Sequence, residues 1–288
     1  KCMRHPQLNR HGELTHLLTT EGLSRILLTR VLDSVETYVV QALGGVATSP
    51  LLQDKKVKAC FRTNAVNSEA KARERFERAA RHLSAEVFNI GMPNIPTALD
   101  CSDLDCDILV IKHPSSGLPF LLAQHSAPHV HIVNAGDGCH ADPTQALLDV
   151  YTIRHIKKDF ANLTIVILGD VLHSPAARST IHALTTLGVA EMRVVAPLTL
   201  LPEGLAQLGV RAYTELSQGL KDADVVIMLP PPHAASLGVH IPSLSEFALS
   251  FGLTEEKLKL AQADCLVIMP EAEHIGDLNR EAVGVAVW

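Results

Sequence analysis

The central part of the chain switches repeatedly between short apolar runs and longer segments of helical periodicity. Residues 129–138 (HVHIVNAGDG) form an apolar run that ends in a glycine-rich loop. From Pro143 to Ile153 apolar residues recur at helical spacing, and proline suits a first helical turn because its missing N–H would have no partner there. A β-branched run, residues 163–168, and a second helical segment, residues 174–184, follow. The pattern predicts a βαβα unit with parallel strands and a right-handed crossover.

The same alternation extends over the rest of the chain. An amphipathic helix is predicted over residues 17–43, starting near Thr20 or Glu21 and stopped by two glycines. A charged helix is predicted over residues 68–83, with Ala72, Phe76, Ala79, Ala80 and Leu83 on its inner face. Further helices are predicted at 216–220 and from about Pro202, and strands at 56–61, 87–90, 107–112, 192–195, 210–213, 224–229 and 265–269. Such alternation is typical of an α/β protein with parallel sheets.

Length and charge narrow the class of protein further. A chain of 288 residues with 47% hydrophobic residues can form two modest domains or one large one. The formal charge is −6 and the basic residues are scattered, so we expect no nucleic-acid partner. The first residues are polar and no run of about 18 apolar residues occurs, so we expect no membrane span and a soluble cytoplasmic protein. The six cysteines contain no CxxC pair, which suits reduced thiols.

One stretch carries a family resemblance. Residues 134–153 (NAGDGCHADPTQALLDVYTI) resemble the segment of aspartate carbamoyltransferase catalytic chains that reads N-x-G-D-G-x-x-x-H-P-T-Q-x-L-L-D. Residues 163–179 are similar to the strand and helix start that follow it, and residues 17–38, 76–90 and 213–230 resemble further segments. The chain is thereby identified as a member of the aspartate/ornithine carbamoyltransferase family.

The resemblance implies an α/β fold of two doubly wound parallel-sheet domains. Residues 1–150 would form a carbamoyl-phosphate-type domain and residues 151–288 an aspartate-type domain, joined through a helix at about 147–158. In the family, the site between the halves holds two anions with cations and preorganised donors. A Ser-Thr-Arg-Thr-Arg run at a helix N-terminus normally grips the phosphate. Here the corresponding residues 70–75 read AKARER, and their high helix propensity predicts helix interior instead, with Arg73 as a vestige.

Other positions that match the family's ligand-binding residues are substituted as well. The histidine that polarises the carbamoyl oxygen corresponds to Asp142, and an arginine of the following helix start corresponds to Pro175. The arginine and glutamine that clasp aspartate are replaced in a loop beginning with Pro230. A His-Pro-x-Pro turn becomes residues 269–272, and the loop between Ile90 and Asp107 lacks lysine and arginine. What remains is Lys112, where an arginine is usual, with Thr144 and Gln145.

These losses lead to two hypotheses about function. A hydrogen bond to a charged group contributes about 1.5–3 kcal/mol, so three lost cations would cost about 5–9 kcal/mol of ligand binding. The sequence predicts a catalytically inactive pseudoenzyme of pyrimidine biosynthesis, without cofactor or metal, kept for a structural or regulatory role. Its assembly would be a homotrimer or a mixed oligomer with another carbamoyltransferase or pathway enzyme. The alternative is an active transferase with altered substrate or weak activity, using Lys112, Gln145 and the pair Arg73 and Arg75.

Several smaller features allow both a structural and a ligand-binding interpretation. The glycines of the two loops are turn residues or phosphate contacts, and the prolines 230–232 stiffen a loop or are recognised by a partner. A loop with aspartates beside two cysteines is exposed or binds a cation. A group of histidines is hydrogen-bonded in the ordinary way or binds a metal. The residues concerned are Gly136, Gly138 and Gly169; Cys101, Asp103, Asp105, Cys106 and Asp107; and His125, His129, His131 and His140.

Overall fold

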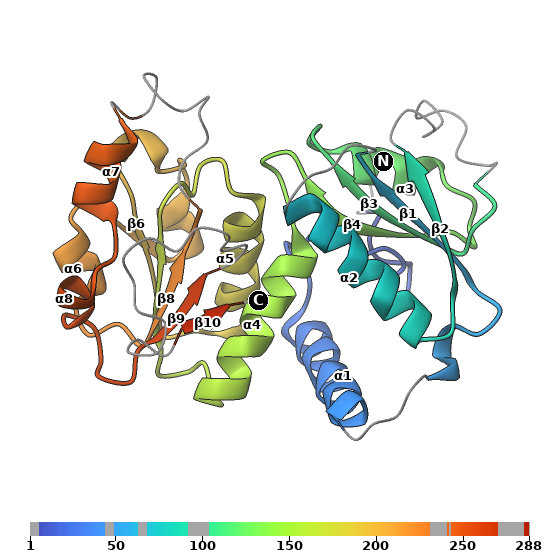
Figure 1. Cartoon of the computed structure of the whole chain (residues 1–288), viewed down its shortest axis with the longest axis horizontal. Coiled ribbons are helices and arrows are strands. Elements are labelled where there is room, and N and C mark those ends of the chain that lie inside the picture. The colour runs from blue at the N-terminus through green and yellow to red at the C-terminus, as the bar shows by residue number, and fades with distance from the viewer. Residues whose placement is uncertain are drawn as a thin grey trace. The chain divides into compact units, whose positions relative to one another are not determined.

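The chain divides into two compact units. The computed structural model describes residues 6–43, 49–62, 68–91, 104–230, 241, 243–269 and 285–287. Unit 1 comprises residues 1–22 and 29–144, and unit 2 comprises residues 23–28 and 145–288. Each unit is built on its own all-parallel sheet (Figure 1), which confirms the predicted α/β fold class. The assignment of one ligand type to each half of the chain stays a prediction.

Unit 1 has a four-stranded sheet in the order β2-β1-β3-β4. Two helices, α1 (Arg25–Leu43) and α4 (Pro143–Lys157), each have residues in both units. The remaining elements are η1 (Pro50–Leu52), β1 (Lys56–Phe61), α2 (Ser68–His82), β2 (Glu86–Gly91), β3 (Ile108–His113), α3 (Leu118–His125) and β4 (His131–Asp137).

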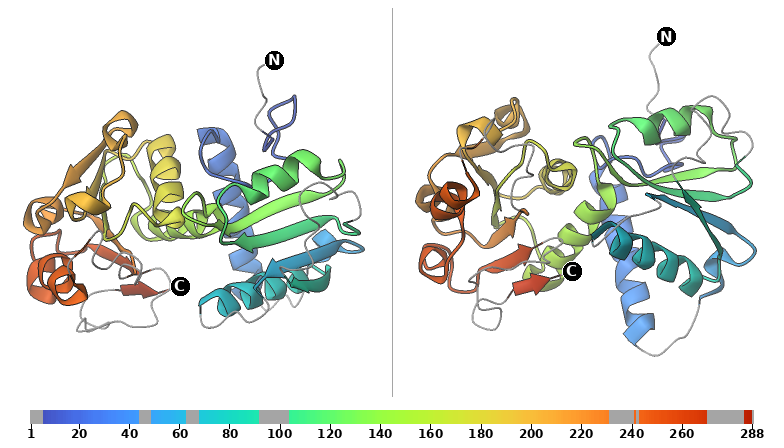
Figure 2. Two further views of the ribbon diagram at one scale, coloured as in Figure 1. Left: turned by 90° about the horizontal axis from the view of Figure 1, so that it is seen from above. Right: turned by 45° about the horizontal axis from the view of Figure 1, so that its top comes forward.

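Both faces of the unit 1 sheet are covered by helices. Successive side chains of a strand point to opposite faces, so Val57, Ala59 and Phe61 pack with α2, whereas Cys60 packs with α3. The two views in Figure 2 show α2 and α3 on opposite sides of this sheet. Burial on both faces explains why these strands read as apolar runs.

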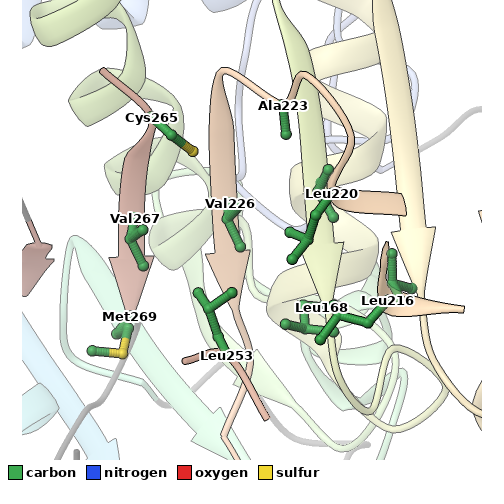
Figure 3. Close-up of a cluster of buried hydrophobic side chains, with 11 residues drawn as sticks. Leu168, Leu216, Leu220, Ala223, Val226, Leu253, Cys265, Val267 and Met269 are labelled. Carbon is green, nitrogen blue, oxygen red and sulfur yellow. The ribbon is translucent and has the colours of Figure 1, made fainter. Parts of the chain in front are cut away.

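Unit 2 has a six-stranded sheet in the order β10-β9-β8-β5-β6-β7. One face is packed with a cluster in which alternate strand residues, such as Val166 and Leu168, contact Leu216 and Leu220 of α6 (Figure 3). The intervening Ile167 is also fully buried, so this sheet is covered on both faces. The elements are β5 (Thr164–Leu168), α5 (Pro175–Leu187), β6 (Glu191–Val195), η4 (Leu198–Leu200), η5 (Leu205–Leu208), β7 (Val210–Tyr213), α6 (Leu216–Leu220), β8 (Val225–Met228), α7 (Leu244–Phe251), α8 (Glu255–Leu258), β9 (Leu266–Met269) and β10 (Val285–Val287).

The predicted start of the first helix is wrong. Helix α1 begins at Arg25, because the apolar residues before it extend along the edge of the unit 1 sheet. The backbone N–H of Leu17 donates to the Ile132 carbonyl at 2.8 Å, and the N–H of Asn134 donates to the Leu17 carbonyl at 2.8 Å. Residue 17 is therefore paired with β4 as a short parallel bridge.

Two smaller predictions also need correction. No α-helix begins near Pro202; the segment instead forms η5, a single 3₁₀ turn between Gly204 and Gly209, whose positive φ angles interrupt any longer helix. On α2, Ala79 is exposed rather than on the inner face, which is made by Ala72, Phe76 and Ala80. The other predicted strands and helices agree with the structure to within a few residues.

Candidate functional site

The candidate site in unit 1 lies where β3 and β4 end. Parallel neighbouring strands bring their carboxyl ends to the same edge of a sheet, which is where ligands bind in open α/β sheets. Gly136 near the end of β4 has a φ of +122°, and a Cβ built on it would lie 3.1 Å from Asp142 Oδ2 and 3.4 Å from Lys112 Cε. The side chains of Lys112 and Asp142 therefore both lie close to Gly136.

Asp142 is a nearly buried carboxylate at this edge. Its side chain is 7% exposed, and its Oδ1 accepts a hydrogen bond of 3.0 Å from the Thr144 hydroxyl. Asp142 immediately precedes Pro143, the first residue of α4, as predicted. The N-terminal end of a helix carries a partial positive charge, so it favours a carboxylate at this position. The Thr144 hydroxyl and the N-terminal end of α4 therefore stabilise an anion that is part of the protein itself, the Asp142 carboxylate.

The glycine-rich loop is held by a second, fully buried carboxylate, Asp137. This side chain accepts hydrogen bonds from Gly117 N at 2.6 Å, Asn134 Nδ2 at 2.8 Å and Ala141 N at 3.0 Å. Its Oδ2 also lies 3.1 Å from Nδ1 of His140. Asp137 therefore joins the loop after β4 to the loop after β3, which favours the structural interpretation of the loop.

The neighbouring glycine is equally constrained. Gly138 has a φ of +53°, and a Cβ on it would collide with Ser116 Oγ and the Pro114 carbonyl. Only glycine allows this close approach of the two loops. Gly138 is thus a turn residue in close contact with protein atoms.

Gln145 is occupied within α4. Its Nε2 donates to Oδ1 of Asp149 at 2.9 Å, and Asp149 is 1% exposed. This hydrogen bond is a typical contact between residues four apart on a helix. A ligand that used the Gln145 amide would have to compete with a buried carboxylate.

Arg73 lies inside α2, which begins at Ser68, so the prediction that residues 70–75 are helix interior is confirmed. Its Nε is 3.4 Å from Glu77 Oε1, within ion-pair distance, yet this buried nitrogen has no hydrogen-bond partner. We take the contact as an ion pair with poor hydrogen-bond alignment. The guanidinium is thus directed toward a carboxylate of its own helix, and the helix N-terminus lies about one turn away.

In unit 2, the turn after β5 is closed by its own side chains. Pro175 is the first residue of α5, and the Ser174 hydroxyl before it accepts from Ala177 N at 3.1 Å. Asp170, 5% exposed, accepts from His173 N at 3.2 Å and lies 2.9 Å from His173 Nδ1. Pro175 therefore brings no charged side chain to the start of α5.

The aspartate–histidine contacts at the ends of β4 and β5 were not predicted. Both have the spacing Asp-x-x-His, Asp137 with His140 and Asp170 with His173, and both aspartates are buried. The repeated spacing after two apolar runs could have revealed them. Their geometry fixes the orientation of each imidazole.

Pro230 is the last described residue of the loop after β8, and it is exposed. Before it, Leu229 N donates to the Leu168 carbonyl at 2.8 Å, which aligns β8 with β5. The predictions for residues 231–233, for residues 270–272, and for Cys101 and Asp103 lie outside the described residues.

The histidines of unit 1 have ordinary hydrogen-bonding positions. Nδ1 of His125 lies 2.9 Å from the Leu121 carbonyl, and Nδ1 of His131 lies 2.8 Å from the Thr15 carbonyl. A metal site on one face of β4 would need His129 and His131 on that strand, but His129 precedes β4. Across the described ranges, no three His, Cys, Asp or Glu side chains are grouped so that they could hold a metal ion.

The acidic residues near β3 are paired with lysines. Asp105 contacts Lys56 at 2.7 Å and Asp107 contacts Lys55 at 2.8 Å. The hydrogen bond from Lys55 lowers the pKa of the Asp107 carboxyl, which therefore stays ionised as a partner of that lysine.

Among the described helices, none is long and apolar enough to cross a lipid bilayer.

Comparison with known protein families identifies the part of the chain that contains this site. Residues 15–155 match the carbamoyl-phosphate-binding domain of aspartate/ornithine carbamoyltransferases. Residues 15–155 therefore belong to the aspartate/ornithine carbamoyltransferase family. The resemblance predicted from residues 134–153 is thereby confirmed.

Solved structures of carbamoyltransferases share the fold of the chain. Aspartate transcarbamoylase from Trypanosoma cruzi, in complex with carbamoyl aspartate and phosphate, is 21% identical with a TM-score of 0.75, over 88% of this chain and 84% of that chain. Ornithine carbamoyltransferase from Pyrococcus furiosus is 20% identical with a TM-score of 0.80, over 95% of this chain and 91% of that one. At this identity the similarity shows the fold of the carbamoyltransferases, and the activity has to be argued from the residues.

Proposed function

We propose that this chain is a pseudoenzyme of the carbamoyltransferase family, which does not transfer a carbamoyl group to aspartate and keeps a structural or regulatory role. The observation that supports it is the buried carboxylate of Asp142 beside Lys112 at the carboxyl ends of β3 and β4. By resemblance, Asp142 stands where the family has the histidine that polarises the carbamoyl oxygen.

The exchange of histidine for aspartate reverses the electrostatics of the reaction. An acyl-transfer step needs hydrogen-bond donors aimed at the oxygen on which negative charge develops. An ionised carboxylate is an acceptor only, so it offers no proton to that oxygen and repels its charge. It also offsets the positive charge of the neighbouring Lys112, which would otherwise attract a phosphate.

The other substituted positions support the same proposal. Arg73 is paired with Glu77 inside a helix, and Pro175 brings no positive charge to the start of α5. Pro230 likewise replaces a residue that would bind the substrate. None of the three positions, Arg73, Pro175 and Pro230, therefore provides a cation to the site. The loss of about 5–9 kcal/mol expected for three charge-assisted contacts corresponds to about 10³- to 10⁶-fold in affinity.

A second candidate function is an active transferase with another substrate or weak activity. It is favoured by Lys112 in β3 and Thr144 at the start of α4, which both lie near Asp142 at the carboxyl end of the sheet, where a small anion would bind. It is opposed by Asp142, which accepts from Thr144 and lies against Gly136 beside Lys112. We therefore prefer the pseudoenzyme.

Isothermal titration with carbamoyl phosphate and with a bisubstrate analogue tests the proposed function. We expect no binding tighter than millimolar and no carbamoyl aspartate formation, because the site lacks concentrated positive charge. Asp142→His alone should not create activity, since the phosphate-binding cations would still be missing. Turnover that disappears in Lys112→Ala would instead establish the active alternative.

We further propose, from the resemblance, a cytoplasmic protein of pyrimidine biosynthesis that assembles as a homotrimer or a mixed oligomer with another carbamoyltransferase or pathway enzyme. The buried clusters of both units are continuous and apolar, so folding has been kept where the site has changed. Most core substitutions destabilise by about 0.5–3 kcal/mol, so a chain without any use would be expected to lose such cores.

Co-expression with an active carbamoyltransferase, followed by native mass spectrometry, tests the mixed assembly. We expect complexes that contain both chains and an altered rate of the active enzyme. Exclusively homo-oligomeric species together with unchanged kinetics would exclude the mixed form.

A further inference from the structure

The outer face of α2 carries a basic hollow in a chain whose formal charge is −6. The hollow has a volume of about 480 Å³, and all its described lining residues are charged residues of this one helix. Four of them are cationic and two are anionic. They are Lys71, Glu74, Arg75, Glu77, Arg78 and Arg81.

The fold of unit 1 turns these charges outward. The apolar side of α2, with Ala72, Phe76 and Ala80, packs against β1 and its neighbours, so the opposite side of the helix faces away from the sheet. Figure 1 shows α2 lying across one face of the unit 1 sheet. Arg75 and Arg78, one turn apart on this outer side, are both exposed.

One of the two carboxylates in the hollow is already paired within the helix. Glu77 has a side chain only 12% exposed, and it lies 3.4 Å from Arg73 and 3.1 Å from Arg81. Glu74 is the exposed carboxylate of the hollow. Its single charge is outnumbered by those of Lys71, Arg75 and Arg78, so the outer face has a net positive charge.

We propose that this face of α2 binds an acidic segment of a partner polypeptide. From Lys71 to Arg81 the helix rises about 15 Å, which matches about ten residues of a partner helix or about five residues of an extended segment. Complementary charge across a surface steers association and selects the partner.

The pattern of charges distinguishes this partner from two others. The same face of a second copy would oppose Arg75 and Arg78 with like charges, so it is not self-complementary. A nucleic acid presents only negative charge along its backbone, which Glu74 in the lining of the hollow would repel. A polypeptide with an acidic majority and one basic residue can satisfy both signs.

Fluorescence anisotropy with a labelled ten-residue peptide of nine glutamates and one lysine, at low ionic strength, tests the proposal. We expect binding that weakens as salt is added, because exposed charges are screened. The double variant Arg75→Glu/Arg78→Glu should weaken it by about tenfold or more. Arg75→Gln/Arg78→Gln, which keeps long helix-forming side chains, should weaken it by a smaller factor.

The matched control places the same change of charge elsewhere in unit 1. Arg10 and Arg30 are exposed and lie outside α2, so Arg10→Glu/Arg30→Glu should leave binding within about twofold. Circular dichroism confirms that each variant keeps its helix content. Failure of the unaltered chain to bind this acidic peptide, or equal weakening by the control, would overturn the proposal. So would tighter, Arg75- and Arg78-dependent binding of a ten-residue oligothymidine, which would point to nucleic acid.

Discussion

Replacing Asp137 by alanine should lower the free energy of unfolding of unit 1 by about 3–5 kcal/mol. The fully buried carboxylate accepts from Gly117 N, Ala141 N and Asn134 Nδ2, and alanine would leave these three donors without an acceptor. A buried donor that loses its partner costs about 1–3 kcal/mol, whereas native stability is only about 5–15 kcal/mol. Urea unfolding followed by circular dichroism measures the loss.

Hydrogen exchange adds a local measurement to the same experiment. In Asp137→Ala the amides of Gly117 and Ala141 should lose protection before those in the middle of the strands, because their acceptor is removed. Asp105→Ala is the control, since Asp105 is an exposed residue with an ion pair to Lys56 and should change stability by less than about 1 kcal/mol. An Asp137→Ala variant as stable as this control would show that the loops are held by other contacts.

The strands could be predicted from the sequence because most are buried on both faces. Runs such as residues 164–168 and 225–228 are apolar at every or nearly every position, and turn residues end them. The start of α1 could not be predicted, because the extended conformation of Leu17 and the burial of Leu18 depend on pairing with β4, more than a hundred residues away. Helix α3 was missed because the apolar segment 118–125 is too short for its period to be recognised.

The candidate site was predictable in part. Parallel topology places Lys112 at the end of one strand and Asp142 after the end of its neighbour, so their proximity follows from the order of strands. The role of Asp137 was not predictable, since its partner Gly117 lies 20 residues earlier and belongs to a loop without a motif. The pairing of Arg73 with Glu77 follows from their spacing of four residues on a helix.

The second prediction with a large expected effect is a loss of stability at acidic pH. His16 is 7% exposed, and its Nδ1 accepts a hydrogen bond of 3.0 Å from Ile132 N, which requires an unprotonated nitrogen. Burial, and next to it the charge of nearby His131, lower the pKa of His16 from 6.5 to about 4. Between these values the unfolded chain binds more protons at this residue than the folded chain does, so stability rises with pH.

The contribution of His16 to the free energy of unfolding is therefore fully present above about pH 6.5 and is lost as the pH falls toward 4. We expect the free energy of unfolding to fall by about 2 kcal/mol by pH 5 and by about 3 kcal/mol in total. Protonation would break one of the hydrogen bonds that attach the segment before α1 to β4. Urea unfolding at a series of pH values measures the change.

The variant His16→Asn isolates this contribution from that of the carboxylates. The asparagine oxygen can accept from Ile132 N at any of these pH values, so the difference in unfolding free energy between the variant and the unaltered chain should move in favour of the variant as the pH falls. His125→Gln is the control, because His125 is exposed and its hydrogen bond is to Leu121 of its own helix. The difference in unfolding free energy between this variant and the unaltered chain should therefore stay nearly constant with pH. Parallel pH profiles for His16→Asn and the unaltered chain would mean that His16 titrates near 6.5 in the folded chain, and the buried, unprotonated imidazole would have to be abandoned.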